Sequence, residues 1–160
     1  MERISKENYY LNIAQTVLER ATCLRRVFGA IIVKNDEIIS TGYNGAPRGR
    51  VNCSQLGYCN REQLNIPSGQ RYELCRSVHA EANAIISAAR RDMVGGTLYL
   101  VGRNAQTGEL LHDATSCAMC RRLVINAGLS KVVIRNTETE FSTVDVQDWV
   151  DLEDDVPDLR

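Results

Sequence analysis

The sequence predicts a three-layer α/β/α sandwich around one central sheet. Three observations lead to this fold class: a hairpin pattern near the start, helix and strand patterns that alternate after it, and 160 residues with 44% hydrophobic and 24% charged content. That size and composition are typical of one globular domain with an apolar core. Alternating helices and strands favour a sheet with helices packed against it.

The first part of the chain predicts a helix and then a hairpin. Residues 5–20 repeat apolar side chains at helical spacing after Ser5, a favourable N-cap residue. The stretch FGAIIVKNDEIISTGYNG then places two β-branched apolar runs on either side of Asn35 and Asp36. Two such runs around a short polar pair are typical of a β-hairpin.

The remaining elements alternate. We expect a helix over residues 79–91 that ends near Gly95, a strand over TLYLVG, a helix over CAMCRRLVINAG with Gly128 as its C-terminal cap, and a strand over KVVIR. These patterns account for four strands. No repeat or low-complexity linker divides the chain, so we expect one structural unit.

Charge is distributed unevenly. The formal net charge is −1, but residues 137–160 hold nine acidic residues and one basic residue, which leaves +7 on residues 1–136. We expect residues 1–136 to form the main domain, and residues 137–160 to be an acidic extension that belongs to the same unit or is partly flexible. The excess of arginine on the main domain favours an anionic ligand such as a phosphate, and a solvated surface fits equally well.

The cysteines point to metal. No apolar run approaches the roughly 20 residues that span a bilayer, and the N-terminus lacks a signal-peptide core, so we expect a cytoplasmic protein without membrane contact. Six cysteines could form three disulfides, but a chain without a secretion signal more often uses thiols for metal. The six are Cys23, Cys53, Cys59, Cys75, Cys117 and Cys120.

Two short blocks carry the chemistry, VHAEANAI and SCAMCRR. Cys117 and Cys120 open a helix at C-x-x-C spacing, which directs two sulfurs to one point and lowers their pKa through the helix N-terminus. Catalytic zinc needs three protein ligands and an open position for water, and His79 completes a His-Cys-Cys set. Glu81 can reach that water without binding the metal and can transfer its proton.

H-x-E followed by C-x-x-C is the signature of zinc deaminases. From about Cys23 to Arg135 the chain resembles the deoxycytidylate (dCMP) deaminase branch of the cytidine deaminase superfamily, through CLRRVFGAIIVKNDEIISTGYNGAPRG, VHAEANAI and SCAMCRRLVINAG. The resemblance implies a cytidine deaminase-like sandwich with a five-stranded mixed sheet and a zinc-dependent catalytic domain over residues 1–136. The fifth strand is absent from the patterns above, and STVDVQ after Arg135 could hold it.

The resemblance also implies an activity, the hydrolysis of dCMP to dUMP and ammonia, which supplies dUMP for thymidylate synthesis. Zinc on the His-Cys-Cys set would lower the pKa of its water. Glu81 would pass the water proton to N3 of the pyrimidine while hydroxide adds to C4, and would then protonate the departing amino group.

Substrate contacts follow from the same resemblance. The backbone NH of Ala80 is expected to donate to the base carbonyl. Asn44 in GYNG corresponds to an asparagine that meets the base and sugar, and a role in a glycine-flanked turn is its alternative. For the phosphate, Arg48 in GAPRGR is the first candidate, with Arg26 and Arg50 behind it, although PRGR could equally be an exposed loop.

Some members of this branch carry a second, structural zinc. Cys23 and Cys53 occupy the positions of two of its ligands, while the other two ligands are histidines that this chain lacks. Cys59 and Cys75 flank the same segment, so we predict a four-cysteine structural zinc site beside the active site. Ordinary buried thiols are the alternative.

Two departures from the family pattern stand out. Ser116 replaces the usual proline before the first zinc cysteine, which frees one backbone NH without removing a ligand. Residues 102–116 are longer than usual and predict a hairpin around residues 106–108, which could reshape the pocket or mediate subunit contacts. His112 lies in this segment without partner spacing, so we predict no functional role for it.

Two other hypotheses stay open. The chain could deaminate cytidine, CMP, guanine or a base in nucleic acid, although 6% aromatic content disfavours nucleic acid as a partner. It could also be a non-catalytic nucleotide-sensing or competence-related zinc module, which Glu81 disfavours because a structural site needs no spare carboxylate. The resemblance further implies a homo-oligomer, often a hexamer, and in some members control by dCTP and dTTP.

Overall fold

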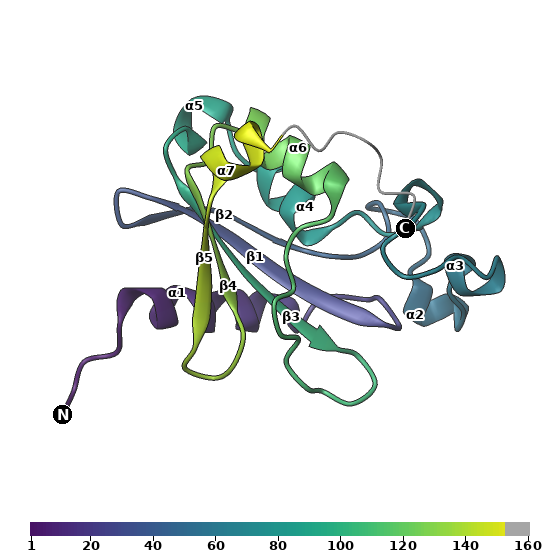
Figure 1. The fold of residues 1–160 in the computed structure, drawn as a ribbon. Helices are drawn as coiled ribbons and strands as arrows, with labels where there is room; N and C mark the ends of the chain where they lie inside the picture. Colours follow the sequence, from purple (N-terminus) through teal and green to yellow (C-terminus); the bar gives the residue numbers. More distant parts are fainter. Residues whose placement is uncertain (153–160) are drawn as a thin grey trace.

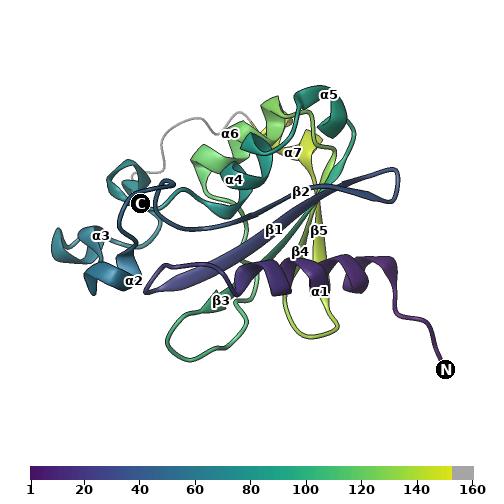
Figure 2. The same ribbon diagram turned by 180° about the vertical axis from the view of Figure 1, so that it is seen from behind.

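A computed structural model describes residues 1–152 and confirms the three-layer architecture. One five-stranded sheet forms the middle layer, with helix α1 (Lys6–Leu18) on one face (Figure 2). Four helices cover the other face (Figure 1): α4 (Ala80–Ile86), α5 (Arg90–Met93), α6 (Ala118–Asn126) and α7 (Val146–Asp151). Two short helices, α2 (Cys53–Leu56) and α3 (Asn60–Gln63), and the 3-10 turn η1 (Tyr72–Leu74) lie beyond one end of the sheet.

The sheet has the order β2-β1-β3-β4-β5. Its strands are β1 (Arg26–Lys34), β2 (Glu37–Tyr43), β3 (Thr97–Asn104), β4 (Lys131–Arg135) and β5 (Phe141–Asp145). Strands β3 and β4 are parallel and every other neighbouring pair is antiparallel, so the sheet is mixed as expected. The fifth strand, β5, occupies the segment in which the sequence left room for it.

The predicted hairpin and the first helix are confirmed. Asn35 and Asp36 both adopt positive φ, 52° and 61°, as a two-residue turn requires when it follows the right-handed twist of its strands. The Ser5 hydroxyl accepts a hydrogen bond from the Asn8 backbone NH at 3.2 Å and caps α1. The Tyr10 hydroxyl donates to the Asp36 carboxylate, which raises the pKa of Tyr10 to about 12 and joins α1 to the hairpin.

The predicted helix over residues 79–91 is wrong in its extent. Helix α4 ends at Ile86, and α5 starts separately after Ala89, whose backbone is extended with ψ 141°. The Ser87 hydroxyl donates to the Asn83 carbonyl at 2.9 Å and supports the break. The turn carries Met93 into the core, where it is 2% exposed, and the small side chains of this stretch give no sequence signal for it.

Both faces of the central strands are buried. On β1, Ile31 and Val33 join the apolar cluster under α1, while Ala30 and Ile32 join the cluster under the helices of the opposite layer. A strand covered on both sides reads as a continuous apolar run, which explains the uninterrupted AIIV pattern. The sheet is therefore a rigid platform for the helix layer above it.

The predicted hairpin in residues 102–116 is also confirmed. The Asn104 side-chain oxygen accepts the backbone NH groups of Gln106 and Thr107, at 2.9 and 3.0 Å. His112 is exposed and contacts Asp113 at 2.9 Å. Residues 137–160, expected as an acidic extension, supply β5 and α7, and 153–160 lie outside the described residues. Within residues 1–152 no helix is long and apolar enough to cross a bilayer.

Gly42 on β2 sets how closely α4 approaches the sheet. A Cβ at this position would lie 2.4 Å from both the Ala80 carbonyl oxygen and the Ala84 backbone nitrogen. We therefore expect Gly42→Ala to displace α4 and lower the free energy of unfolding by about 1–3 kcal/mol. Denaturant titration measures this as a lower midpoint at unchanged slope.

The control is Thr41→Ser, on the exposed face of the same strand, which should leave the midpoint nearly unchanged. A Gly42→Ala variant as stable as wild type would contradict the close contact between α4 and β2.

Candidate active site

The site forms where helices α4 and α6 begin, on the same face of the sheet (Figure 1). His79 is the N-cap residue of α4 and Cys117 the N-cap residue of α6. The turn before α4 is fixed to the end of β2, because Gly45 and Val78 exchange backbone hydrogen bonds and the Asn83 side chain donates to the Tyr43 carbonyl at 2.8 Å. The side chains of His79 and Cys117 are thus positioned by the first turns of α4 and α6.

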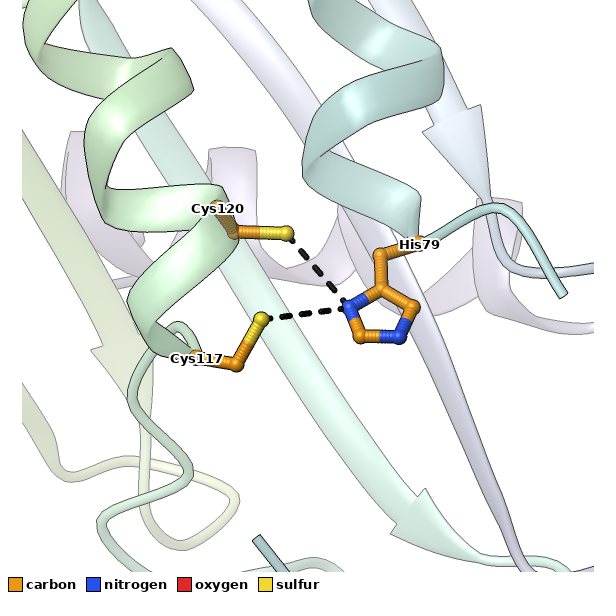
Figure 3. Close-up of side chains that lie close together, drawn as sticks. All are labelled: His79, Cys117 and Cys120. Carbon is orange, nitrogen blue, oxygen red and sulfur yellow. Dashed lines mark hydrogen bonds between the residues drawn. The ribbon is translucent and has the colours of Figure 1, made fainter. Parts of the chain in front are cut away.

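His79, Cys117 and Cys120 converge as the sequence predicts (Figure 3). The His79 Nδ1 atom lies 3.5 Å from the Cys117 Sγ atom and 3.4 Å from the Cys120 Sγ atom. The three ligand atoms all lie within 4.8 Å of one another, which no other group of His, Cys, Asp or Glu within residues 1–152 achieves. Two sulfurs and one imidazole at these separations are a donor set that suits zinc.

The three side chains of this cluster shift one another's pKa values. Hydrogen bonding to Cys117 and then to Cys75 raises the pKa of His79 to about 10. The hydrogen bond from the Cys120 thiol lowers the pKa of Cys117 most, and the His79 ring lowers it further. Burial opposes them, and the pKa falls to about 4. The pKa of Cys120 is raised, first by its hydrogen bond to Cys117 and then by burial. The lowered pKa favours the thiolate form of Cys117, which is the form that binds a metal ion, and a bound metal would displace the protons of His79 and Cys120.

Glu81 lies beside the cluster without belonging to it. Its side chain is 5% exposed in the first turn of α4 and lines the same pocket as His79. Its carboxylate also contributes to the raised pKa of Cys120, which shows how close it lies to the sulfurs. A buried carboxylate next to three metal ligands can transfer protons at a metal centre.

A pocket opens beside these residues. It comprises about 770 Å³ of space, part of it open to solvent. Its lining adds two aromatic, three cationic and three thiol side chains to the cluster. These are Phe28, Tyr72, Arg25, Arg26, Arg61, Cys23, Cys59 and Cys75.

Only some of the residues expected to contact substrate line the pocket. Ala80, Asn44 and Arg26 line the pocket, whereas Arg48 and Arg50 are exposed and do not. Both polar ends of the Asn44 side chain are engaged: its Oδ1 accepts the Phe28 backbone NH at 2.8 Å, and its Nδ2 donates to the Arg26 carbonyl at 2.9 Å. Asn44 therefore also joins the end of β2 to β1.

Arg61 and Tyr72 were missed by the sequence analysis. The Arg61 guanidinium carbon lies 4.4 Å from the centre of the Tyr72 ring, and that ring meets the His79 imidazole edge-on at 5.1 Å. Both come from residues 53–75, hereafter the insertion, which the sequence marked only as a carrier of cysteines. Two arginines and two tyrosines in this segment offered no spacing that distinguishes these from the others.

Three of the four remaining cysteines belong to the insertion, and the fourth, Cys23, lies near it. Cys23, Cys59 and Cys75 line the pocket, and Cys53 is buried. Burial, followed by the neighbouring Cys23, Cys75 and Cys59, raises the pKa of the Cys53 thiol, so the four share one neighbourhood. No three of these sulfurs are as closely grouped as the ligand atoms of the His79 cluster.

The fold and the His-Cys-Cys cluster together define an α/β/α protein with a zinc site at two helix N-termini. Residues 4–136 match the family model of the cytidine and deoxycytidylate deaminase zinc-binding region, and the chain belongs to this family. The family predicted from the sequence is thereby confirmed.

Two relatives are similar to this chain in sequence, and one solved structure is similar to it in fold. The chain is 34% identical over 138 residues to deoxycytidylate deaminase of Mycobacterium phage D29, covering 83% of this chain and 96% of that one. It is 33% identical over 131 residues to deoxycytidylate deaminase of Schizosaccharomyces pombe, covering 82% of this chain and only 37% of that relative. The fold resembles that of dCMP deaminase from cyanophage S-TIM5 in complex with dCMP and dUMP, with TM-score 0.55, 24% identity and coverage of 84% and 85%.

We expect the metal to depend on the cluster and not on Glu81. His79→Ala and Cys117→Ser remove one ligand each and should each lower the zinc content by about one ion per chain. Glu81→Gln keeps all three ligands and should retain wild-type zinc. Elemental analysis of the purified proteins measures the content, and His79→Ala protein with undiminished zinc would contradict the assignment.

Proposed function

We propose that this protein catalyses the zinc-dependent hydrolysis of dCMP to dUMP and ammonia, and so supplies dUMP for thymidylate synthesis. The observation that carries the proposal is a buried carboxylate, Glu81, beside a His-Cys-Cys cluster in a pocket with aromatic and cationic walls. Relatives of this family that are named deoxycytidylate deaminases support the choice of substrate.

His79, Cys117 and Cys120 would hold the zinc ion, which supplies a Lewis acid that lowers the pKa of a coordinated water. Glu81 would act as the proton carrier: its carboxylate would accept one proton from the attacking water and deliver it to N3 as the water oxygen bonds to C4. It would then take the proton left on that oxygen and pass it to the exocyclic nitrogen, so that the C4–N bond breaks, the C4 carbonyl forms and ammonia leaves. Burial of Glu81 keeps bulk water from competing for that proton.

The remaining contacts would orient the base. The first backbone NH of α4, at Ala80, has no partner within the helix and is free to donate to the base carbonyl. Phe28 and Tyr72 give the pocket apolar walls for a planar ring. Asn44 lies at the same wall and would meet the base or sugar through the donor and acceptor capacity that its two backbone contacts leave.

We propose the oligomeric state, the regulation and the cellular location of the protein from the family resemblance. A homo-oligomer, such as a hexamer, is supported by exposed apolar side chains on α4 and α6, namely Ile86, Met119 and Leu123. Control by dCTP and dTTP is carried over from the resemblance alone. Six unpaired cysteines support a reducing, cytoplasmic compartment.

The proposed activity is tested by ammonia release. Zinc-loaded protein is offered dCMP, CMP, deoxycytidine, cytidine and guanine side by side. We expect dCMP to be turned over fastest, and Glu81→Ala to lower its kcat by about 10²–10⁴-fold, the usual contribution of a general acid-base group.

Turnover of another substrate above dCMP would replace the proposed substrate. Zinc-loaded wild-type protein that releases ammonia from none of them would overturn the activity, and would favour a non-catalytic nucleotide-binding role.

We further propose that Cys23, Cys53, Cys59 and Cys75 bind a second, structural zinc. Their shared neighbourhood and the electrostatic interaction among their thiols support this, and zinc binding would draw the sulfurs together. Cys59→Ser should then lose about one zinc per chain and loosen the insertion, seen as faster proteolysis within residues 53–75. The control is Ser54→Ala, on the exposed face of α2. Unchanged zinc stoichiometry in Cys59→Ser would contradict the site.

A further inference from the structure

Arg61 is a buried cation without a buried counter-charge. Its side chain is 5% exposed, and no carboxylate within residues 1–152 lies at ion-pair distance from it. Its partners are neutral carbonyl oxygens, Pro67 at 2.8 Å from Nη2 and Gln70 at 3.1 Å from Nε and 2.7 Å from Nη2. Because a buried charge is unfavourable unless it is compensated, this position favours an anion from outside the chain.

The guanidinium has donors left for such an anion. An arginine has five N–H groups, and those on Nε and Nη2 serve the carbonyls of the insertion. The two N–H groups on Nη1 have no acceptor within residues 1–152, and Arg61 lines the catalytic pocket. The carbonyls and the Tyr72 ring hold the guanidinium plane in place, so little freedom is lost when it binds a ligand.

Its distance from the metal cluster suits a single nucleotide. The contact of 4.4 Å from Arg61 to Tyr72 and the contact of 5.1 Å from Tyr72 to His79 together place the guanidinium carbon within 9.5 Å of the imidazole centre. A pyrimidine whose amino group reaches the zinc extends its sugar and 5′-phosphate over a comparable length. Base and phosphate can therefore be held at the two ends of one pocket.

Two more cations lie at this pocket. Arg26 begins β1 with an exposed side chain, and the half-buried Arg25 forms an ion pair with Glu62 on α3 at 2.9 Å. Because Glu62 already forms an ion pair with Arg25, Arg26 and Arg61 are the pocket arginines without an ion pair among residues 1–152. Arg48, the first candidate for phosphate binding in the sequence analysis, is exposed and does not line the pocket.

We propose that Arg61, assisted by Arg26, binds the 5′-phosphate of the substrate, and that the insertion thereby selects a nucleoside monophosphate over the free nucleoside. This inference rests on the proposed deaminase function. Arg61 contributes two N–H donors on one nitrogen to the phosphate oxygens, and Arg26 adds a second positive charge at the open side of the pocket.

The test compares dCMP with deoxycytidine, which differ only in the phosphate. For Arg61→Gln and Arg26→Gln we expect kcat/KM for dCMP to fall about 10- to 100-fold, the effect of losing a charge-assisted hydrogen bond, while the value for deoxycytidine stays within about twofold. The loss should appear mainly in KM. The matched control is Arg71→Gln in the same insertion, exposed and paired with Glu73, which should change neither value.

Equal loss of activity on both substrates in Arg61→Gln would overturn the proposal, because a purely structural arginine would act in that way. If Arg61→Gln does not fold, Arg61→Lys replaces it; this variant keeps the charge and loses the planar fork. It should keep deoxycytidine turnover and lose about tenfold on dCMP, and a wild-type ratio between the substrates would overturn the proposal. A selective loss in Arg48→Gln alone would also overturn it.

Failure of the deaminase function gives a different result. Wild-type protein that turns over neither dCMP nor deoxycytidine contradicts the proposed function, and calorimetric binding of dUMP against deoxyuridine then tests the arginines by themselves. Tighter binding of dUMP that is lost in Arg61→Gln supports the phosphate site, and equal affinities for the two overturn it.

Discussion

The structure depends on the meeting of two helix N-termini over one face of the sheet. His79 and Cys117 each precede a helix, and both helices must lie close to the strands for the side chains to meet. On the α4 side, Gly42 permits the backbone contact, and the Ser40 hydroxyl donates to the Ala84 carbonyl at 2.7 Å. A helix N-terminus stabilises the negative charge of a bound thiolate, so the same geometry that gathers the ligands also favours their reactive form.

The α6 side of the site is supported from the C-terminal part of the chain. The Arg121 side chain donates to the Ser116 carbonyl at 3.0 Å, immediately before Cys117, and its guanidinium carbon lies 5.2 Å from the centre of the Trp149 ring on α7. Ser116, where the family usually has proline, is 2% exposed. We infer that Arg121 restrains a turn that a proline ring would otherwise restrain. Residues 137–151 are thus part of the unit that holds the zinc site, and the acidic extension cannot be treated as a simple appendage.

The convergence of His79, Cys117 and Cys120 was predictable because it depends on short spacings. Cys117 and Cys120 lie three positions apart at one helix start, and His79 and Glu81 lie two positions apart at another, so local geometry fixes which side chains can converge. The fifth strand needed the family resemblance, because β5 is half-exposed and lacks the continuous apolar run of β1. The break between α4 and α5 could not be foreseen, since it is driven by burial of Met93 and by one serine hydroxyl.

The roles of the residues in the insertion could not be predicted from the sequence, for a physical reason. Its short helices have too few residues for a periodic pattern, so nothing in the sequence distinguishes a buried arginine from an exposed one. An arginine that binds a ligand is distinguished by its burial and by its surroundings. Arg135 shows that burial alone does not identify one. It is 1% exposed, and its guanidinium donates to the amide oxygens of Asn8, Asn12 and Gln15, which ties β4 to α1 outside the catalytic pocket.

Arg135 and Arg61 therefore differ in what they leave unsatisfied. Both terminal nitrogens of Arg135 have acceptors within the fold, its Nε atom is buried without a partner among residues 1–152, and burial lowers its pKa. Arg61 has one terminal nitrogen without an acceptor in residues 1–152, beside a pocket that can admit a ligand. A nucleoside would offer that nitrogen no acceptor in place of its phosphate, whereas a monophosphate would supply one. The proposed selection for phosphate would then come from this difference between the two ligands.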